Sequence, residues 1–323
     1  MKYIEFTEMG DPAEVLHLKE APSKPLKAGE ARVKVLAAPI HPANLLQIAG
    51  RYGTAAELPS RPGGEGIGSI AEMAPDVAHL KVGQLVMLAG GATWCDEMVG
   101  PATSFIPLPD GDVEQLSMLT VNPLTAHLIL ESFVNLTAGD WIVQSAANSA
   151  VGEYIIQLAA QRGIKTINIV RRENLAVDLK ALGADVVLVD GPDLAARAAE
   201  ASGGAPIMLA IDSVAGETFS AMIDMLTFGG TLVSYGALSG QPSALTPGTV
   251  IFNDIRVRGF WLSKWFEITS QEDKQAAFGK IIPLVASGAI KATIDSRYSL
   301  EDIKAAVVRA AEPGRNGKVL LTP

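Results

Sequence analysis

Short apolar runs broken by glycine and proline dominate the first third of the chain. Residues 31–38 alternate partly between apolar and polar positions, residues 66–73 follow a Pro-Gly-Gly turn, and residues 84–89 precede two glycines. Alternation with a period of two is typical of strands with one buried face, and clustered turn residues end such strands. The pattern therefore predicts an irregular, partly closed antiparallel β domain over residues 1–118.

The pattern then changes, and apolar residues recur at helical spacing in residues 114–119 and 123–133. Beyond them, strand-like runs alternate with helix-like stretches such as 151–162 and 173–182. Strands and helices in this order form βαβ units, and right-handed crossovers lay the strands into one parallel sheet. We therefore expect residues 119–264 to form a doubly wound α/β domain. The predicted strands are residues 141–146, 165–170, 185–189, 207–211, 230–235 and 254–260.

The remaining residues, 265–323, hold only two helix-like runs (271–286 and 300–311) and two short strands (292–297 and 318–321). These elements are too few to bury a core of their own. We expect residues 265–323 to pack back onto the first domain, so that the α/β domain is inserted into the β domain.

Composition narrows the classes of function. The chain of 323 residues is 48% hydrophobic and carries a formal net charge of −9. Its basic residues form no cluster longer than Arg171-Arg172, so nucleic-acid binding is not expected. No apolar run is long enough for a membrane span. The start of the chain has no apolar signal core and no Arg-rich leader, and a single cysteine is consistent with a reducing compartment, so we expect a cytoplasmic protein.

The first predicted strand of the α/β domain leads into an informative motif. Residues 146–152 are small and polar, and a helix follows them. A dinucleotide-binding fold has its glycine-rich turn here, because the free N–H groups and the dipole of a helix N-terminus favour the pyrophosphate. If Gly152 is the third position of the G-x-G-x-x-G pattern, Ala147 and Ser149 stand at the first two. The motif is degenerate, and the strand, turn, helix and strand around it support it.

The next predicted strand ends where an NADH-binding fold carries an acidic residue for the ribose 2′-hydroxyl. This chain has Arg171-Arg172 there, and Arg171 lies 19 residues after Gly152. A carboxylate would repel a 2′-phosphate, whereas guanidinium groups bind it with charge-assisted hydrogen bonds. NADPH is therefore the expected cofactor, and the alternative is a solvated arginine pair at a strand end.

Five segments of the chain carry a resemblance to a known family: Gly50–Gly53, Val121–Ala126, Gln144–Gly152, Thr166–Arg172 and Arg258–Trp265. With the order of the domains, they resemble the zinc-independent medium-chain dehydrogenase/reductase superfamily, and within it the mitochondrial-type 2-enoyl thioester reductases. The resemblance implies a Rossmann-type doubly wound parallel sheet inserted into a GroES-like irregular β domain. General quinone reductases of this superfamily usually have Gly-Gly-Val-Gly at the turn and lack the two tryptophans of the last segment.

Zinc-binding members of the superfamily carry a Cys-His pair in the first third of the chain and a Gly-His-Glu motif further on. In this sequence Gly64 stands at the place of the second histidine, and no cysteine is near either motif. One cysteine and four scattered histidines supply no tetrahedral N/S set by spacing, so no metal site is expected. His41 is interpreted as structural, with a substrate contact as the alternative, and Cys95 as a buried packing residue.

The expected chemistry follows from the missing zinc ligands. Without a Lewis acid the substrate itself must stabilise the developing negative charge, which an activated C=C bond does by forming an enolate. With the resemblance, this predicts NADPH-dependent reduction of a 2-enoyl thioester, with hydride added to the β-carbon and a proton to the α-carbon. An NADPH quinone or enone reductase is the alternative, and a non-catalytic NADPH-binding module is a further one.

The resemblance implies Tyr52 as the proton donor, because a tyrosine phenol is neutral at pH 7 and can release a proton. It places Asn122 near the nicotinamide and Phe260–Leu262 over it. Residues at the ends of the parallel strands also contact the cofactor, as ligands do in open α/β sheets. The implied cofactor residues are Asn122, Thr125, Asn148, Ser149, Ala150, Val151, Arg171, Arg172, Tyr235, Gly236, Ala237, Leu238, Phe260, Trp261, Leu262 and Lys318.

The implied partners are a small-molecule substrate (an enoyl thioester, or an enone or quinone) and, for a carrier-bound acyl chain, acyl carrier protein. Residues 255–260 form a candidate edge strand. An unpaired edge can pair with a second copy across a two-fold axis, so a homodimer is expected.

Overall fold

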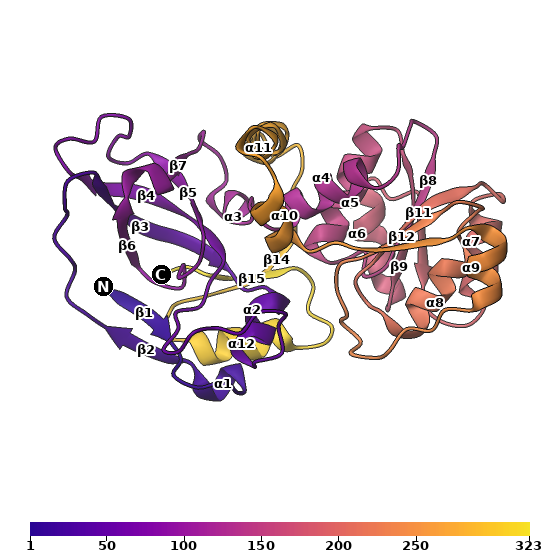
Figure 1. Cartoon of the computed structure of the whole chain (residues 1–323), viewed down its shortest axis with the longest axis horizontal. Helices are drawn as coiled ribbons and strands as arrows, with labels where there is room; N and C mark the ends of the chain where they lie inside the picture. Colours follow the sequence, from indigo (N-terminus) through magenta and orange to yellow (C-terminus); the bar gives the residue numbers. More distant parts are fainter. The chain divides into compact units, whose positions relative to one another are not determined.

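The computed structural model describes all 323 residues, which divide into two compact units (Figure 1). The first unit holds Met1–Val121 and Gly279–Pro323, and the second holds Asn122–Phe278. The sequence pattern places the return to the first unit at residue 265. In the structure the first half of α11 (Gln271–Ala286) stays with the second unit, where Phe278 stacks on Phe266.

The second unit is built on a sheet of six parallel strands, and all six predicted strands are present. They are β8 (Trp141–Gln144), β9 (Lys165–Val170), β10 (Val186–Val189), β11 (Ile207–Asp212), β12 (Thr231–Ser234) and β13 (Arg256–Gly259). Their order is β10-β9-β8-β11-β12-β13. Counted from β8, this is the order 3-2-1-4-5-6 of a doubly wound sheet, which reverses between β8 and β11. The predicted fold class is confirmed.

Helices cover both faces of this sheet. One apolar cluster packs Phe219 of α8 with Ile167, and another packs Ile156 of α5 with Val170. Ile167 and Val170 are three residues apart on β9, so they face opposite sides of the sheet. The helices of this unit are α4 (Asn122–Ser132), α5 (Ala150–Gln161), the 3₁₀-helix η2 (Glu173–Leu175), α6 (Ala176–Ala181), α7 (Leu194–Ala201), α8 (Gly216–Asp224), α9 (Pro247–Asn253) and α10 (Leu262–Ile268).

The first unit is built mainly on antiparallel strands. A two-stranded sheet pairs β1 (Lys2–Glu5) with β2 (His17–Glu20). The larger sheet has the order β14-β15-β3-β4-β5-β7, and β6 also pairs with β3. Its strands are β3 (Glu30–Pro39), β4 (Glu65–Met73), β5 (Leu85–Ala89), β6 (Glu97–Pro101), β7 (Ile106–Pro107), β14 (Ile294–Tyr298) and β15 (Lys318–Leu321).

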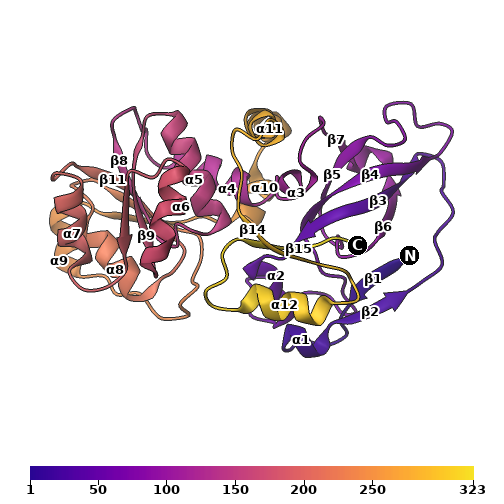
Figure 2. The ribbon, with the colours of Figure 1, turned by 180° about the vertical axis from the view of Figure 1, so that it is seen from behind.

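The C-terminal segment returns to this sheet because β15 pairs antiparallel with β3 and parallel with β14. The last helix, α12 (Ile303–Ala311), packs against β15 and against two short helices from the N-terminal half, α1 (Pro12–Val15) and α2 (Pro42–Ile48) (Figure 2). The other short helices of the unit are η1 (Ala102–Ser104) and α3 (Val113–Leu116). None of the helices in the chain has the length and apolar content needed to cross a bilayer.

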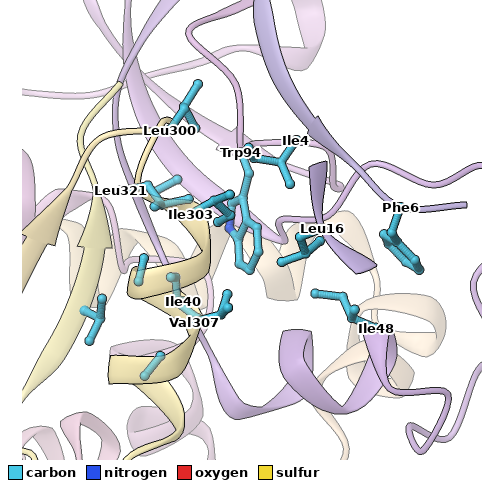
Figure 3. Close-up of a cluster of buried hydrophobic side chains, with 14 of the residues drawn as sticks. Ile4, Phe6, Leu16, Ile40, Ile48, Trp94, Leu300, Ile303, Val307 and Leu321 are labelled. Carbon is cyan, nitrogen blue, oxygen red and sulfur yellow. The ribbon is translucent and has the colours of Figure 1, made fainter. Parts of the chain in front are cut away.

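An apolar core joins the two ends of the chain in the first unit. Figure 3 shows Trp94 among Leu16, Ile40, Ile303 and Leu321, and all of these side chains are buried. Burying a leucine or isoleucine side chain contributes about 1.5–3 kcal/mol. Leu321 and Val319 of β15 both belong to this core, so alternation turns Lys318 toward the other face of the strand. A buried lysine there requires a polar partner.

Candidate active site

The turn between β8 and α5 has the backbone that a phosphate-binding turn needs. Ser149 is the N-cap of α5, and its hydroxyl accepts a hydrogen bond from the N–H of Gly152 at 3.2 Å. A Cβ at Gly152 would lie 2.5 Å from the carbonyl oxygen of Ala147, a distance that no side chain tolerates. The glycine is therefore required for the close approach of turn and helix, as the third position of the motif demands.

Buried side chains that the sequence reasoning missed connect the strand ends below this turn. Gln144 donates from Nε2 to the carbonyl oxygen of Gly152 at 3.0 Å and to Oδ1 of Asn168 at 2.8 Å. Ser145 donates to Asp212 at 2.7 Å. These bonds join β8 to β9 on one side and to β11 on the other, so they hold the sheet where its winding reverses. Such pairings across strands carry no local sequence signal.

The predicted 2′-phosphate residues follow β9 directly. Arg171 and Arg172 are both exposed at the carboxyl end of that strand. The turn before α5 follows the carboxyl end of the neighbouring strand β8. Carboxyl ends of parallel strands lie at the same edge of a sheet, so the structure brings the arginine pair and the phosphate turn to one edge.

Two further groups of predicted cofactor residues lie at the same edge. Tyr235–Leu238 follow β12, and Phe260–Leu262 follow β13. Burial raises the pKa of the Tyr235 phenol, and the Ser213 and Ser149 hydroxyls oppose this shift. Phe260 packs its ring edge-to-face on Phe133, with centroids 6.2 Å apart.

Asn122 and Thr125 lie on α4, which packs against α5. Both side chains are buried. Oδ1 of Asn122 has no hydrogen-bond partner within the protein. A buried amide oxygen without a partner is costly, so it marks a place where a polar ligand group fits.

The two remaining predicted residues belong to the first unit. Tyr52 lies in the loop after α2 and is half-buried. Lys318 is buried, and its Nζ lies 3.0 Å from Nδ1 of His41. The structure therefore gives His41 a lysine partner that is distant in the sequence, which supports the structural interpretation of this histidine.

Glu65 is the functional candidate that the sequence reasoning missed. Its side chain is fully buried, and Oε1 lies 2.7 Å from Nε2 of His41. Oε2 accepts hydrogen bonds from the backbone N–H groups of Thr120 at 2.7 Å and Val121 at 2.9 Å. Burial raises the pKa of Glu65 to about 8, against the opposing effects of Lys318 and the two amides. An acidic residue directly after Gly63-Gly64 at the start of a buried strand was the available signal.

The side chains at the place of a catalytic zinc do not fit that metal. Both ring nitrogens of His41 have protein partners, Glu65 and Lys318. Cys95 is buried and donates to the carbonyl oxygen of Ala92 at 3.3 Å, and burial raises its thiol pKa to about 12. Zinc takes the thiolate form of cysteine and a free lone pair of imidazole, whereas both ring nitrogens of His41 are engaged and the single cysteine is a buried thiol whose raised pKa disfavours the thiolate.

Two family models match the chain, one in each unit. The model described as "Alcohol dehydrogenase GroES-like domain" matches residues 27–110. The model described as "Zinc-binding dehydrogenase" matches residues 150–280. The second description names the metal of other members, and the donor set above departs from it.

Curated relatives match over almost the whole chain. The mitochondrial enoyl-[acyl-carrier-protein] reductase of Homo sapiens is 35% identical over 97% of this chain and 86% of the relative. The protein of the same name from Dictyostelium discoideum is 33% identical over 98% of this chain and 93% of the relative.

Solved structures agree with this relationship. A putative NADPH:quinone reductase from Bacillus thuringiensis has a TM-score of 0.89 at 30% identity, covering 100% of this chain and 98% of that one. An Etr1p complex with NADP and crotonyl-CoA has a TM-score of 0.89 at 26% identity, covering 100% and 99%. A mitochondrial 2-enoyl thioester reductase Etr1p/Etr2p heterodimer from Candida tropicalis has a TM-score of 0.88 at 27% identity, covering 100% and 99%.

The relatives correct one expectation and confirm another. A cytoplasmic location is wrong by this comparison, because the curated relatives are named as mitochondrial enzymes. That expectation rested on the residues at the start of the chain and on the cysteine count, and the cysteine count reports only a reducing environment, which does not identify one compartment. The predicted family is confirmed, since identity above 30% extends over nearly the whole of both proteins. The chain belongs to the enoyl thioester reductases of the medium-chain dehydrogenase/reductase superfamily.

Proposed function

We propose that the protein is an NADPH-dependent reductase of 2-enoyl thioesters. The observation that carries this proposal is the 35% identity, over 97% of the chain, to a relative named as an enoyl-[acyl-carrier-protein] reductase. A donor set that does not fit zinc supports it. A conjugated thioester needs no Lewis acid, because its own carbonyl group takes up the developing negative charge.

Residues of the second unit would hold the cofactor. Asn148–Val151 and the N-terminus of α5 suit a pyrophosphate, and Arg171 with Arg172 suits a 2′-phosphate. Asn122 offers its unpartnered, buried Oδ1 to an N–H donor such as the nicotinamide carboxamide. When bound, NADPH supplies a hydride for the β-carbon of the substrate.

Other predicted residues complete the proposed cofactor site. Thr125 is one turn beyond Asn122 on the same helix. Tyr235–Leu238 and Phe260–Leu262 line the carboxyl edge of the sheet, and Trp261 keeps 42% of its surface exposed for a ligand. Lys318 is the remaining predicted cofactor residue.

Tyr52 is the proposed proton donor. The electron pair of the substrate's C=C bond moves onto the thioester carbonyl as hydride adds to the β-carbon, and this leaves an enolate. Tyr52 releases its phenolic proton to the α-carbon, and water returns a proton to the phenolate. The products are a saturated thioester and a neutral tyrosine.

A substrate panel with NADPH tests the proposal. We expect oxidation of NADPH with crotonyl-coenzyme A and longer 2-enoyl thioesters at rates well above those with small quinones. Tyr52→Phe should lower kcat about 10²- to 10⁴-fold, because it removes general acid catalysis. Tyr298→Phe alters another half-buried tyrosine of the first unit and serves as the matched control.

Each alternative has its own outcome on this panel. Turnover of quinones without turnover of any enoyl thioester would establish the quinone or enone reductase, which the 30% identity to a quinone reductase structure favours as second candidate. Tight NADPH binding without turnover on either panel, and no effect of Tyr52→Phe, would establish a non-catalytic module.

The protein is also proposed to act as a homodimer in fatty acid metabolism, with acyl carrier protein as one carrier of its substrate. The edge strand β13 supports the dimer, because all four of its residues are exposed. The names of the curated relatives support the carrier. A comparison of kcat/KM for matched acyl carrier protein and coenzyme A thioesters tests the carrier.

A further inference from the structure

Three buried polar side chains form one hydrogen-bonded chain in the first unit. Lys318 of β15 contacts Nδ1 of His41 at 3.0 Å, and Nε2 of His41 contacts Oε1 of Glu65 at 2.7 Å. Glu65 begins β4, and His41 is the N-cap of α2. All three are at least 95% buried, so this chain of contacts replaces their hydration.

The far end of this network holds the backbone. Oε2 of Glu65 accepts from the N–H groups of Thr120 and Val121, at 2.7 and 2.9 Å. Both backbone groups are donors only, so Oε2 remains an acceptor in either protonation state of the carboxyl group. A proton on this group could sit only on Oε1, which faces His41. The two hydrogen bonds from the backbone of residues 120–121 to Oε2 therefore do not depend on whether Glu65 is charged.

Asn122 is the next residue, and it begins α4. Its buried Oδ1 has no partner within the protein, and the proposed function assigns it to the nicotinamide. Lys318, at the opposite end of the network, is also a proposed cofactor residue. Glu65 and His41 thus connect a proposed cofactor lysine to the backbone directly before a proposed cofactor asparagine.

We propose that Glu65 is a positioning residue for the nicotinamide half of the site. By holding the amides of Thr120 and Val121, it sets the direction in which Asn122 presents its side chain. His41 fixes Glu65 in turn through its contact with Lys318. The inference rests on the proposed cofactor placement, and it adds a residue that touches neither cofactor nor substrate.

Two ligands separate positioning from a purely structural role. NADPH carries the nicotinamide, whereas adenosine 2′,5′-bisphosphate carries only the half proposed for Arg171 and Arg172. Glu65→Leu leaves the two amides without an acceptor. We expect it to raise the Kd for NADPH about tenfold and to leave the Kd for adenosine 2′,5′-bisphosphate within about twofold. Glu65→Gln keeps an oxygen for the two amides but turns its NH2 group toward Nε2 of His41, so its loss of NADPH affinity should be smaller than that of Glu65→Leu.

A matched control comes from the same unit. Gln115 is buried and exchanges two hydrogen bonds with the backbone of Ala292, at 2.9 and 2.8 Å. Gln115→Leu removes these bonds without touching Glu65, and both ligands should bind as in the wild type. If Glu65→Leu does not fold, Glu65→Asp withdraws the acceptor by one methylene and should show the same selective loss of NADPH affinity.

A double-mutant cycle completes the test. In an Asn122→Ala background, Glu65→Leu should weaken NADPH binding no further, because the residue that it positions is gone. Equal weakening of both ligands by Glu65→Leu, or full additivity with Asn122→Ala, would overturn the inference. These experiments measure binding, so they test the inference independently of the proposed function. A protein in which Glu65→Leu selectively weakens NADPH binding, but which reduces no enoyl thioester, would overturn only the substrate assignment.

Discussion

The charge and position of Arg171 and Arg172 predict one chemical group of the ligand, a 2′-phosphate. Their position follows from spacing within one βαβ unit, and the structure brings them to the edge of the sheet that carries the phosphate turn. Gly152 is a second case, because a Cβ there would meet the carbonyl oxygen of Ala147 at 2.5 Å. In both cases a local pattern corresponds to a local geometry.

Replacing both arginines with alanine tests the cofactor assignment. The double variant should raise the KM for NADPH about 10- to 100-fold, because charge-assisted hydrogen bonds to the 2′-phosphate are lost. The KM for NADH should change less than about threefold. Steady-state kinetics with both cofactors measure the ratio, and Arg256→Ala, an exposed arginine at the amino end of β13, is the control. Equal changes for the two cofactors would identify the pair as solvated side chains.

The hydrogen-bond partners of Glu65 could not be predicted at the residue scale, although its position after two glycines marks it as unusual. Its neighbours in the network, residues 41, 120, 121 and 318, are spread over most of the chain. In the sequence it appears as one acidic residue in a glycine-rich turn, and only Gly64 beside it bears on zinc binding. Its burial and its partners depend on the register between strands.

At the scale of elements, β13 and the segments around it keep apolar surface exposed. Val257 of β13 is 41% exposed, and Phe252 of α9 is 78% exposed. The strand lies at the end of the six-stranded sheet, with one partner only. An edge strand has unpaired backbone N–H and C=O groups, which can pair with the same strand of a second copy.

Placing a charge on this edge tests the proposed dimer. Val257 lies in the interior of the four-residue strand, so a two-fold axis through the edge would bring it close to its own copy. Val257→Lys should weaken the dimer at least about tenfold, since it opposes like charges in addition to the neighbouring arginines. Light scattering over a dilution series measures the mass in solution and so the concentration at which the dimer dissociates. Val177→Lys, at an exposed valine of α6, should remain dimeric, and an unchanged dimer in Val257→Lys would exclude this edge as the interface.

At the scale of the whole molecule, contacts between distant segments decide the buried polar chemistry. The pKa of His41 is held well below its usual 6.5, first by burial and then by the charges of Lys318 and Arg315. The folded protein therefore binds this proton less readily than the unfolded chain. The contribution of His41 to stability is present above pH 6.5 and is lost as the pH falls.

The pH dependence of unfolding tests this sign. Between pH 7 and pH 5, the wild type should lose up to about 2 kcal/mol of unfolding free energy relative to His41→Asn, which has no proton to take up. Burial raises the pKa of Glu65 to about 8. The folded protein therefore binds this proton more readily than the unfolded chain, and the contribution of Glu65 to stability declines as the pH rises toward 8. Urea unfolding at each pH gives the difference in unfolding free energy between the two proteins. Titrating groups that both proteins contain, such as Glu65, contribute less to this difference than to either value alone. Parallel pH profiles would contradict a neutral, buried His41.

The sequence by itself determined the order of the elements and the positions of the turn proposed for the phosphates and of the arginine pair. Each depends on periodicity or spacing within a few tens of residues, and backbone geometry translates such patterns directly into local structure. Only the tertiary structure decided the boundary inside α11, the unpartnered oxygen of Asn122 and the network of Glu65, His41 and Lys318. These features arise where strands distant in the sequence pair, and burial then forces their polar side chains to find partners among each other.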